Sequence, residues 1–435
     1  MMVSFEVPPV DGGPDPPPSG PWDLSLLTGS LPLAISLAGL VGAVYLMARR
    51  DRSWWLRLAP ALLAGATALT GLTALVINSW WRPLPDELPA RVFAWVGVAL
   101  LGVAFAVAGW PGQRWWRRGL AVLAALLVLA TAGIKVNAFY GYYPRLRDVI
   151  GLPAANEISF SALATGPATM PDTGRVTHAS IPGAVSGFVA RPASIYLPPG
   201  YLVGERRPAL PVLVLIPGQP GLPYDWFTAG RLATVMDRYA AEHRGLAPVV
   251  VVPDATGSLF GNPLCLDSNL GNSETYLARD VPDWIVRNLR VDTDRRHWAI
   301  GGFSYGGTCA LQLGVRAPAT YPTFVAISGQ DEPSLGDHAQ TVAAAFGGDE
   351  ARFQAVNPAN LLATGRFPNS LAVIAIGAQD GDYLAGARRV AASARAAGMQ
   401  VRYLEPPGGH SWTVAVAALG AALPLITPAL GLGEK

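Results

Sequence analysis

Four long apolar stretches fill the first third of the chain, at 24–47, 56–77, 92–110 and 120–139. Each is close to the roughly 20 residues that an α-helix needs to cross the hydrocarbon core of a bilayer. One such stretch alone would also suit a buried helix of a soluble domain, but four in series, with tryptophans and arginines at their ends, are typical of transmembrane helices. The pattern therefore predicts an all-α transmembrane region of four helices at 24–140.

Arginines in the short loops predict which way these helices cross. The loops ARRDRSWWLR and GQRWWRRG follow the first and third stretches, whereas the loop SWWRPLPDELPAR and the N-terminal tail carry fewer basic and several acidic residues. Loops rich in arginine stay on the cytoplasmic side, so we expect the N-terminus and everything after residue 140 to lie outside the membrane. The tail, 1–23, is rich in Pro and Gly and lacks the basic start of a signal peptide, so we expect a disordered extracytoplasmic tail.

Apart from Arg57, which belongs to the basic loop at the start of the second span, Lys135 is the only Asp, Glu, Lys, Arg or His inside a predicted span. It is close to the outer end of the fourth span, where a lysine side chain can extend to the interface. Transporters and channels usually carry functional charges within the membrane. The four spans are therefore interpreted as an anchor, and a transporter with an accessory domain is the less favoured hypothesis.

A different pattern begins near residue 176, where short apolar runs alternate with amphipathic segments. The segments include predicted helices at 275–288 and 307–316, and the runs predict strands at 211–216, 248–252, 298–300, 323–327, 371–376 and 401–404. This alternation is typical of a mostly parallel, doubly wound sheet. We expect an α/β domain at 176–435, joined to the membrane region by a linker at 141–175.

The last apolar run, at 413–432, has two interpretations. It is long enough to suggest a fifth span. Its two prolines, Pro424 and Pro428, and its position directly after the last predicted strand favour a final helix packed on the sheet. A fifth crossing would also carry the C-terminus into the cytoplasm.

Composition agrees with a chain that lies partly in a membrane. Of its 435 residues 51% are hydrophobic and only 14% are charged, which is too apolar for an ordinary soluble protein. No basic run interleaved with aromatic residues resembles a nucleic-acid surface, so we expect no nucleic-acid partner. With five histidines and no clustered Cys and His, a metal site is not expected either.

The sequence GGFSYGG at 301–307 has the G-x-S-x-G pattern of a nucleophile elbow. A short apolar strand at 297–300 precedes it, and a helix begins near residue 308. Small residues flank the serine in such elbows because the sharp turn brings backbone close on both sides. We expect Ser304 to be a catalytic nucleophile at the carboxyl end of a strand, where the functional residues of doubly wound sheets gather.

A serine nucleophile of this type needs an acid and a histidine later in the chain. The strand predicted at 371–376 runs into GAQDGD, which offers Asp380 and Asp382. We prefer Asp380 because it follows the strand sooner, and Asp382 is the alternative. His410 follows the last predicted strand after a glycine pair, and we expect it to take the proton of the serine while the aspartate holds the imidazole tautomer.

An oxyanion hole needs two backbone N–H groups aimed at the developing negative charge. Tyr305, the residue after the nucleophile, should supply one. The other should come from the loop PGQPG at 217–221, where Pro220 has no N–H to donate, so Gln219 is preferred. Asp254, which follows the strand predicted at 248–252, is interpreted as a loop-stabilising carboxylate.

Three blocks of this sequence resemble a known family: ETYLARDVPDW at 274–284, GFSYG at 302–306 and HSW at 410–412. The family is that of the putative esterases among the α/β-hydrolases, which contains esterase D and the mycobacterial antigen 85 mycolyltransferases. The resemblance covers about 195–423. It implies ester hydrolysis or acyl transfer to sugar hydroxyls without a cofactor, with nucleophile Ser304 and base His410.

The resemblance also implies Tyr305 and Gln219 as oxyanion donors. Two departures from the antigen 85 pattern are evident. Those proteins use Glu as the triad acid, where Asp380 or Asp382 stands here, and they carry an arginine just after the first oxyanion donor, where this chain has Pro220. Both departures speak against a trehalose mycolyltransferase.

The two cysteines, Cys265 and Cys309, both lie in the predicted outer domain. Cys309 is five positions after Ser304, on the helix of the elbow, and Cys265 lies in a long loop that should cross above it. An oxidising location allows a disulfide between them. Two buried free thiols are the alternative.

The leading hypothesis is a membrane-anchored, extracytoplasmic serine esterase that acts on lipid-linked or cell-envelope esters. An acyltransferase that moves an acyl chain to a sugar or lipid hydroxyl would use the same catalytic residues and is the first alternative. A non-catalytic envelope-binding or scaffold protein is the second, and the complete Ser, Asp and His set speaks against it.

Overall fold

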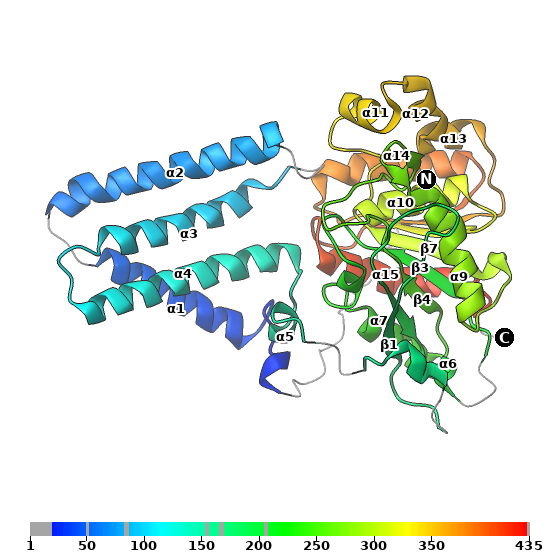
Figure 1. Ribbon diagram of the computed structural model, residues 1–435, viewed down its shortest axis with the longest axis horizontal. Helices are drawn as coiled ribbons and strands as arrows, with labels where there is room; N and C mark the ends of the chain where they lie inside the picture. Colours follow the sequence, from blue (N-terminus) through cyan, green and yellow to red (C-terminus); the bar gives the residue numbers. More distant parts are fainter. Residues whose placement is uncertain are drawn as a thin grey trace. The chain divides into compact units, whose positions relative to one another are not determined.

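The chain folds into two compact units, Pro16–Leu152 and Pro153–Lys435. The computed structural model, drawn in Figure 1, describes residues 20–48, 52–81, 87–152, 156–164, 169–203 and 208–432. The tail predicted at 1–23 and parts of the predicted linker therefore lie largely outside the described residues. The first unit is all-α and the second is α/β, in agreement with the fold class expected from the sequence.

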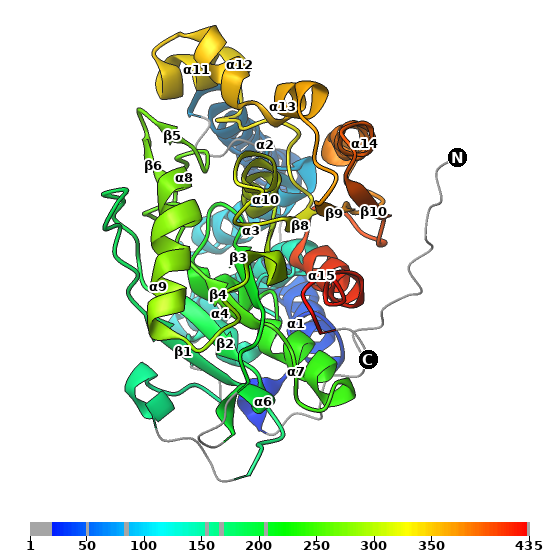
Figure 2. The same ribbon diagram turned by 90° about the vertical axis from the view of Figure 1, so that its right-hand side faces the viewer.

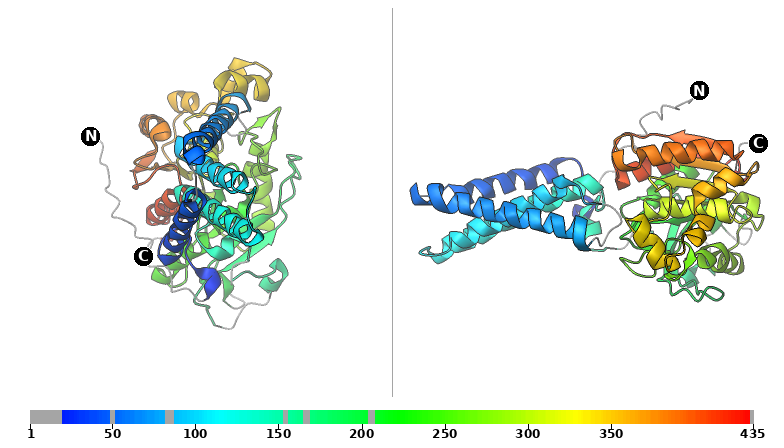
Figure 3. Two further views of the ribbon diagram at one scale, coloured as in Figure 1. Left: turned by 90° about the vertical axis from the view of Figure 1, so that its left-hand side faces the viewer. Right: turned by 90° about the horizontal axis from the view of Figure 1, so that it is seen from above.

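Four helical segments of the first unit are long and apolar enough to cross a membrane: Ser30–Met47 (α1), Trp54–Trp81, Ala90–Ala108 (α3) and Trp115–Tyr140 (α4). The second consists of α2, Ala59–Leu75, with a π-helical turn at each end, Trp54–Leu58 and Val76–Trp81. They coincide with the four apolar stretches of the sequence, and Lys135 lies exposed on α4. Figure 3 shows them, in blue to cyan, running alongside one another.

Small residues let these helices approach closely. Helix α4 packs against both α1 and α3, and α3 packs against α2. A Cβ placed on Gly42 of α1 would lie 2.8 Å from the carbonyl oxygen of Ala124 on α4, so a larger residue would push the two backbones apart. Close contact at glycine and alanine is how membrane helices gain packing energy where no hydrophobic driving force acts between them.

An eight-stranded sheet forms the centre of the second unit, in the order β1-β2-β4-β3-β7-β8-β9-β10. The six strands from β4 to β10 in this order are parallel, and β1 and β2 are antiparallel additions at one edge. The strands are Arg175–Ala179 (β1), Ala193–Leu197 (β2), Val212–Ile216 (β3), Val249–Val252 (β4), Trp298–Phe303 (β7), Thr323–Ile327 (β8), Leu371–Ala375 (β9) and Gln400–Leu404 (β10). The sheet is thus mostly parallel, as the alternation of apolar runs predicts.

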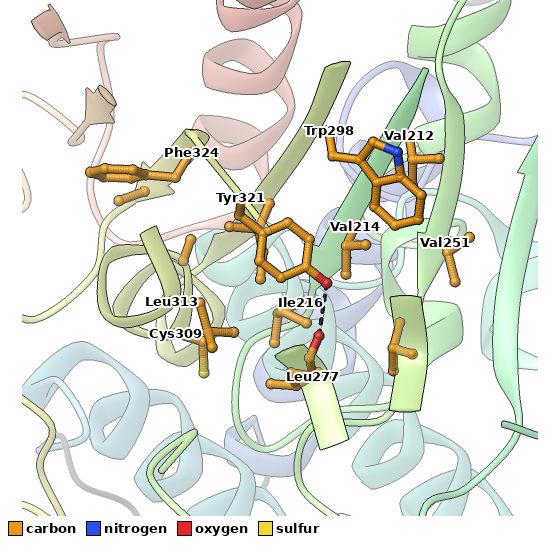
Figure 4. Close-up of a cluster of buried hydrophobic side chains, with 14 of the residues drawn as sticks. Val212, Val214, Ile216, Val251, Leu277, Trp298, Cys309, Leu313, Tyr321 and Phe324 are labelled. Carbon is orange, nitrogen blue, oxygen red and sulfur yellow. Dashed lines mark hydrogen bonds between the residues drawn. The ribbon is translucent and has the colours of Figure 1, made fainter. Parts of the chain in front are cut away.

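The central strands are apolar throughout because helices cover both faces of the sheet. Every residue of β3, VLVLI, is buried, as expected for a parallel strand covered on both faces. Val212, Val214 and Ile216 point to the face that holds the largest core cluster, where they meet Cys309 and Leu313 of α10 (Tyr305–Arg316) (Figure 4). In the same cluster the Tyr321 hydroxyl donates a hydrogen bond to the Leu277 carbonyl at 2.7 Å.

The helices form a layer on each side of the sheet (Figure 2). One layer includes α10 together with α9 (Val281–Asn288), α13 (Pro358–Thr364) and α14 (Gly381–Ala396), all of which contribute to the largest core cluster or pack against its members. The other includes α7 (Leu232–Glu242) and α15 (Trp412–Ile426), which pack on each other. The remaining short elements are α5 (Leu146–Val149), α6 (Pro199–Leu202), β5 (Asp267–Ser268), β6 (Gly271–Asn272), α8 (Ser273–Thr275), α11 (His338–Phe346), α12 (Glu350–Val356) and the turns Pro21–Asp23, Phe160–Ala164, Pro223–Trp226, Tyr276–Asp280 and Arg295–His297.

The last apolar run of the sequence forms α15, which packs on β8 and β9. Eight of its residues are buried, and Pro424 lies inside it. The favoured interpretation, a final helix on the sheet, is therefore confirmed. The helix is apolar because one flank meets the sheet and another meets α7.

Candidate active site

Ser304 stands at the sharp turn between β7 and α10. Its φ of 58° and ψ of −119° are a conformation that residues other than glycine rarely adopt. Its N–H donates to the Ile327 carbonyl of the neighbouring strand at 2.9 Å. A Cβ on Gly306 would lie 2.1 Å from the carbonyl oxygen of Ile216, so the second glycine of the motif is needed for this turn to fit against β3.

His410 reaches Ser304 from the loop after β10. Its Nε2 lies 2.9 Å from Ser304 Oγ, and its Nδ1 lies 2.9 Å from Asp380 Oδ2. The rings of Phe303 and Tyr383 lie 5.0 and 5.1 Å from the imidazole, between centroids, and restrict its rotation. The three predicted residues therefore form one hydrogen-bonded chain, in which a carboxylate at Nδ1 leaves Nε2 free to accept the serine proton.

The two aspartates after β9 lie in different surroundings. The side chain of Asp380 is only 3% exposed and faces His410. Asp382 lies in the first turn of α14 and is exposed. It borders a polar cavity of about 230 Å³ with Gln330 and Arg389. Asp380 is the carboxylate bonded to the histidine, as preferred from the sequence.

The loop 217–221 lies beside the nucleophile. A Cβ placed on Gly218 would be 3.5 Å from the Cβ of Ser304, so the next residue, Gln219, is close to the position of a bound ester. Gln219 is joined to Pro220 by a cis peptide bond, and its side-chain amide donates to the Phe260 carbonyl at 3.0 Å. This geometry is compatible with the predicted donor role of its N–H.

Tyr305 begins α10, so its N–H has no acceptor within the helix and lies next to Ser304. Burial raises the pKa of its phenol, and the hydroxyl donates to the Ala255 carbonyl at 3.2 Å. Cys265 and Cys309 form a disulfide, and the Sγ of Cys265 lies 3.3 Å from the Tyr305 hydroxyl oxygen. The disulfide and the tyrosine together fasten the loop after β4 to the elbow helix.

An arginine that the sequence analysis did not single out holds the loop 217–221 in place. Arg191 Nε and Nη2 donate to the two carboxylate oxygens of Asp254 at 2.9 and 2.7 Å. The same Nη2 donates to the Gly221 carbonyl at 3.0 Å and to Thr256 Oγ1 at 2.7 Å. One feature of the sequence could have indicated this residue: Arg191 is the sole Arg, Lys, Asp or Glu in the stretch 176–204.

Asp254 is 1% exposed, and its ionisation depends on this arginine. Burial alone would raise the pKa of Asp254, but the Arg191 side chain, the Arg191 N–H and the Thr256 N–H outweigh burial and hold the pKa below its usual range. The carboxylate therefore stays charged and anchors the loops after β3 and β4 to the chain before β2. This agrees with the loop-stabilising role expected for Asp254.

We expect Arg191→Met to lower kcat for a short-chain ester by roughly tenfold to a hundredfold, with a smaller change in KM. Loss of the bond to Gly221 would let the donor loop shift, and a misplacement of about 1 Å costs up to about 100-fold. The readout is steady-state kinetics of the full-length protein. A change confined to KM would contradict the positioning role.

The pH dependence of the free energy of unfolding distinguishes the positioning role of Arg191 from a general packing defect. Arg191→Met leaves a buried carboxylate whose pKa burial then raises, so the loss of stability should shrink as the pH is lowered from 7 toward the ordinary pKa of about 4. Arg388→Met is the matched control, because its solvent-exposed pair with Glu405, 3.0 Å apart, is expected to contribute little to stability at any pH in this range. If the loss of stability depended on pH equally in Arg191→Met and Arg388→Met, the assignment of Arg191 as the partner that keeps Asp254 charged would be contradicted.

Comparison with known proteins fits this geometry. Residues 190–426, more than half of the chain, match the family model described as "Putative esterase". The chain belongs to this esterase family. An uncharacterized protein of Corynebacterium glutamicum is 38% identical to this chain over 413 residues, which cover 89% of this chain and 94% of that protein. The family expected from the sequence is thus confirmed.

Solved structures support the same fold. A ferulic acid esterase aligns with a TM-score of 0.51 and 21% identity, over 60% of this chain and 99% of its own. An S-formylglutathione hydrolase from Agrobacterium tumefaciens aligns with a TM-score of 0.51 and 18% identity, over 61% of this chain and 99% of its own. At these identities the two structures establish an α/β-hydrolase fold for the second unit. Within the described residues, no group of three or more His, Cys, Asp or Glu side chains is placed to hold a metal ion.

Proposed function

We propose that this member of the esterase family is a membrane-anchored, extracytoplasmic serine esterase that acts on lipid-linked or cell-envelope carboxylic esters. The observation that carries the proposal is the hydrogen-bonded series from Ser304 Oγ to His410 to Asp380, with both distances 2.9 Å. A hydroxyl becomes a nucleophile at neutral pH when an adjacent base can take its proton. Ser304 has such a base within hydrogen-bond reach, at the strained turn that presents it.

The reaction begins with attack of Ser304 Oγ on the ester carbonyl carbon while His410 Nε2 takes the hydroxyl proton. The carbonyl oxygen becomes an oxyanion, which accepts hydrogen bonds from the N–H groups of Tyr305 and Gln219. Asp380 stabilises the imidazolium by accepting a hydrogen bond from Nδ1. When the tetrahedral intermediate collapses, the carbon–oxygen bond to the alcohol breaks and His410 returns its proton to the leaving alcohol oxygen.

Water completes the cycle. His410 takes a proton from a water molecule as the water oxygen attacks the carbonyl carbon of the acyl-enzyme. A second oxyanion forms in the same place, the bond to Ser304 Oγ breaks, and the serine recovers its proton from His410. The free acid leaves, and no cofactor takes part.

Two observations support the proposed membrane anchoring and orientation. Four helical segments are long and apolar enough to cross a membrane, and their arginine-rich loops are those after the first and third spans. Under the positive-inside rule this arrangement leaves the esterase unit on the outer side. Proximity to the bilayer favours lipid-linked or envelope-derived esters as substrates.

The proposal is tested with the purified full-length protein and p-nitrophenyl butyrate. We expect p-nitrophenol release, and an acyl-enzyme that mass spectrometry of acid-quenched protein locates on the peptide containing Ser304. The product should be the free acid, whereas a new ester formed with an added alcohol would identify an acyltransferase. Turnover without modification of Ser304 would contradict the proposed mechanism.

A further inference from the structure

Exposed apolar side chains of the second unit, 153–435, gather on four loops. Among its described residues, large apolar side chains are exposed at eight positions, of which Met170 and Val286 lie elsewhere. The other six lie on the loops 183–189, 219–222, 257–262 and 268–272. They form what we name the apolar rim: Val185, Val189, Leu222, Leu259, Phe260 and Leu270.

The loops 219–222 and 257–262 are hydrogen-bonded to each other beside the nucleophile. The Gly221 N–H donates to the Leu259 carbonyl at 3.3 Å, and the Gln219 side chain donates to the Phe260 carbonyl at 3.0 Å. The loop 217–221 is also the one that lies against Ser304. The apolar rim therefore borders the oxyanion side of the active site.

The other two loops join the same surface. A Cβ placed on Gly257 would lie 3.2 Å from the carbonyl oxygen of Val189. The Asn272 side chain donates to the Ser186 carbonyl at 2.9 Å. All four loops are thus linked in one neighbourhood at the carboxyl edge of the sheet.

The segments that carry the rim contain no charged residue. Asp, Glu, Lys and Arg are absent from 181–190, 217–222, 255–262 and 268–272. Val189 is 83% exposed and Phe260 is 61% exposed, so both protrude from the surface. Clustered apolar side chains that protrude from a soluble surface mark a site of interaction.

We propose that the apolar rim inserts into the interfacial layer of the bilayer to which the chain is anchored, and so holds the oxyanion side of the active site against the lipid surface. The inference rests on the membrane anchoring in the proposed function. A lipid surface fits the rim better than a protein partner, because protein interfaces surround an apolar centre with a polar and charged margin. The four spans also keep the rim at a high effective concentration near a bilayer.

Depth-dependent quenching tests the insertion. The full-length protein carries Phe260→Cys or Val189→Cys, labelled with the environment-sensitive fluorophore NBD and placed in nanodiscs that contain doxyl-labelled phospholipid. The native cysteines are joined in a disulfide and do not compete for the label. Val286→Cys, an exposed apolar position on α9 outside the four rim loops, is the matched control.

We expect the nitroxide lipids to quench the label at 260 and at 189 by about half and the label at 286 only slightly, as for side chains at the acyl boundary. Equal quenching at the three positions would overturn the inference. So would unquenched labels at both 260 and 189 in protein whose thermal melt matches that of the wild type. This readout does not depend on turnover, so it is independent of the proposed activity.

Hydrolysis rates with a vesicle-embedded ester and a soluble ester test what the insertion does. We expect the double variant Val189→Ser, Phe260→Ser to hydrolyse a long-chain ester embedded in vesicles about tenfold more slowly, while its rate with a water-soluble short-chain ester stays within about threefold. Val286→Ser should change neither rate. Equal changes with both esters would overturn the role of the rim, whereas wild-type protein that hydrolyses neither ester would overturn the proposed function instead.

Discussion

Replacing Ser304 by alanine is expected to lower kcat for ester hydrolysis by roughly 10⁴-fold to 10⁶-fold. The substitution removes the oxygen that attacks the carbonyl, whereas the N–H groups of Tyr305 and Gln219 remain in place. Alanine at the same strained φ and ψ should change the free energy of unfolding by less than about 1 kcal/mol. Initial rates with p-nitrophenyl butyrate and a thermal melt of the full-length protein provide the two readouts.

Ser328 is the matched control for this variant. It lies directly after β8, the strand next to β7, and has a φ of 47°. It is 1% exposed, and within the described part of the chain its hydroxyl has no hydrogen-bond partner. Ser328→Ala should therefore stay within about threefold of the wild-type rate. Comparable losses in the two variants would contradict the assignment of Ser304 as nucleophile.

Asp380→Asn is expected to lower kcat by about 10⁴-fold, while KM changes little. An amide at this position can donate its N–H to Nδ1 of His410, which would favour the wrong imidazole tautomer and would not stabilise the imidazolium. Stopped-flow measurement of acylation checks this expectation, because both the attack and the release of the alcohol depend on His410. The fold should survive, since asparagine has nearly the same shape.

Asp382→Asn is the natural comparison, because the same substitution is made two residues away. Asp382 is exposed on α14. The Asp382→Asn variant is therefore expected to keep a rate within about threefold of that of the wild type. If Asp382→Asn lost as much activity as Asp380→Asn, or more, the identification of the acid would be wrong. If both variants were fully active, the histidine would work without a carboxylate and the proposed mechanism would fail.

The sequence predicted the features that depend on local pattern. Four long apolar helices followed from apolar length, the parallel sheet followed from alternating runs, and the elbow at Ser304 followed from glycines that only a tight turn requires. The preference for Asp380 over Asp382 followed from its shorter distance to the strand. The structure explains why that distance matters: α14 begins at Gly381, so Asp380 stays at the sheet edge while Asp382 turns away with the helix.

Features that depend on contacts between distant residues were not predicted. Arg191 is 63 residues from Asp254, and no local pattern couples them. The strands β1 and β2 were not predicted either. Strand β1 reads RVTHA, a mixture of polar and apolar residues at an antiparallel edge. Strand β2 reads ASIYL and is buried throughout, so the sequence analysis missed it although its pattern was available. The apolar rim could not be seen either, since exposure is a property of the folded loops.

The central claim is that Ser304 is an activated nucleophile on the outer side of the membrane. The most direct test is labelling of intact cells that express the full-length chain with a membrane-impermeant fluorophosphonate probe, compared with cells that express Ser304→Ala. We predict that the wild-type protein is labelled on intact cells and that the variant is not. Labelling only after lysis would contradict the orientation, and no labelling of the wild-type protein in either condition would contradict the esterase mechanism and favour a non-catalytic envelope-binding protein.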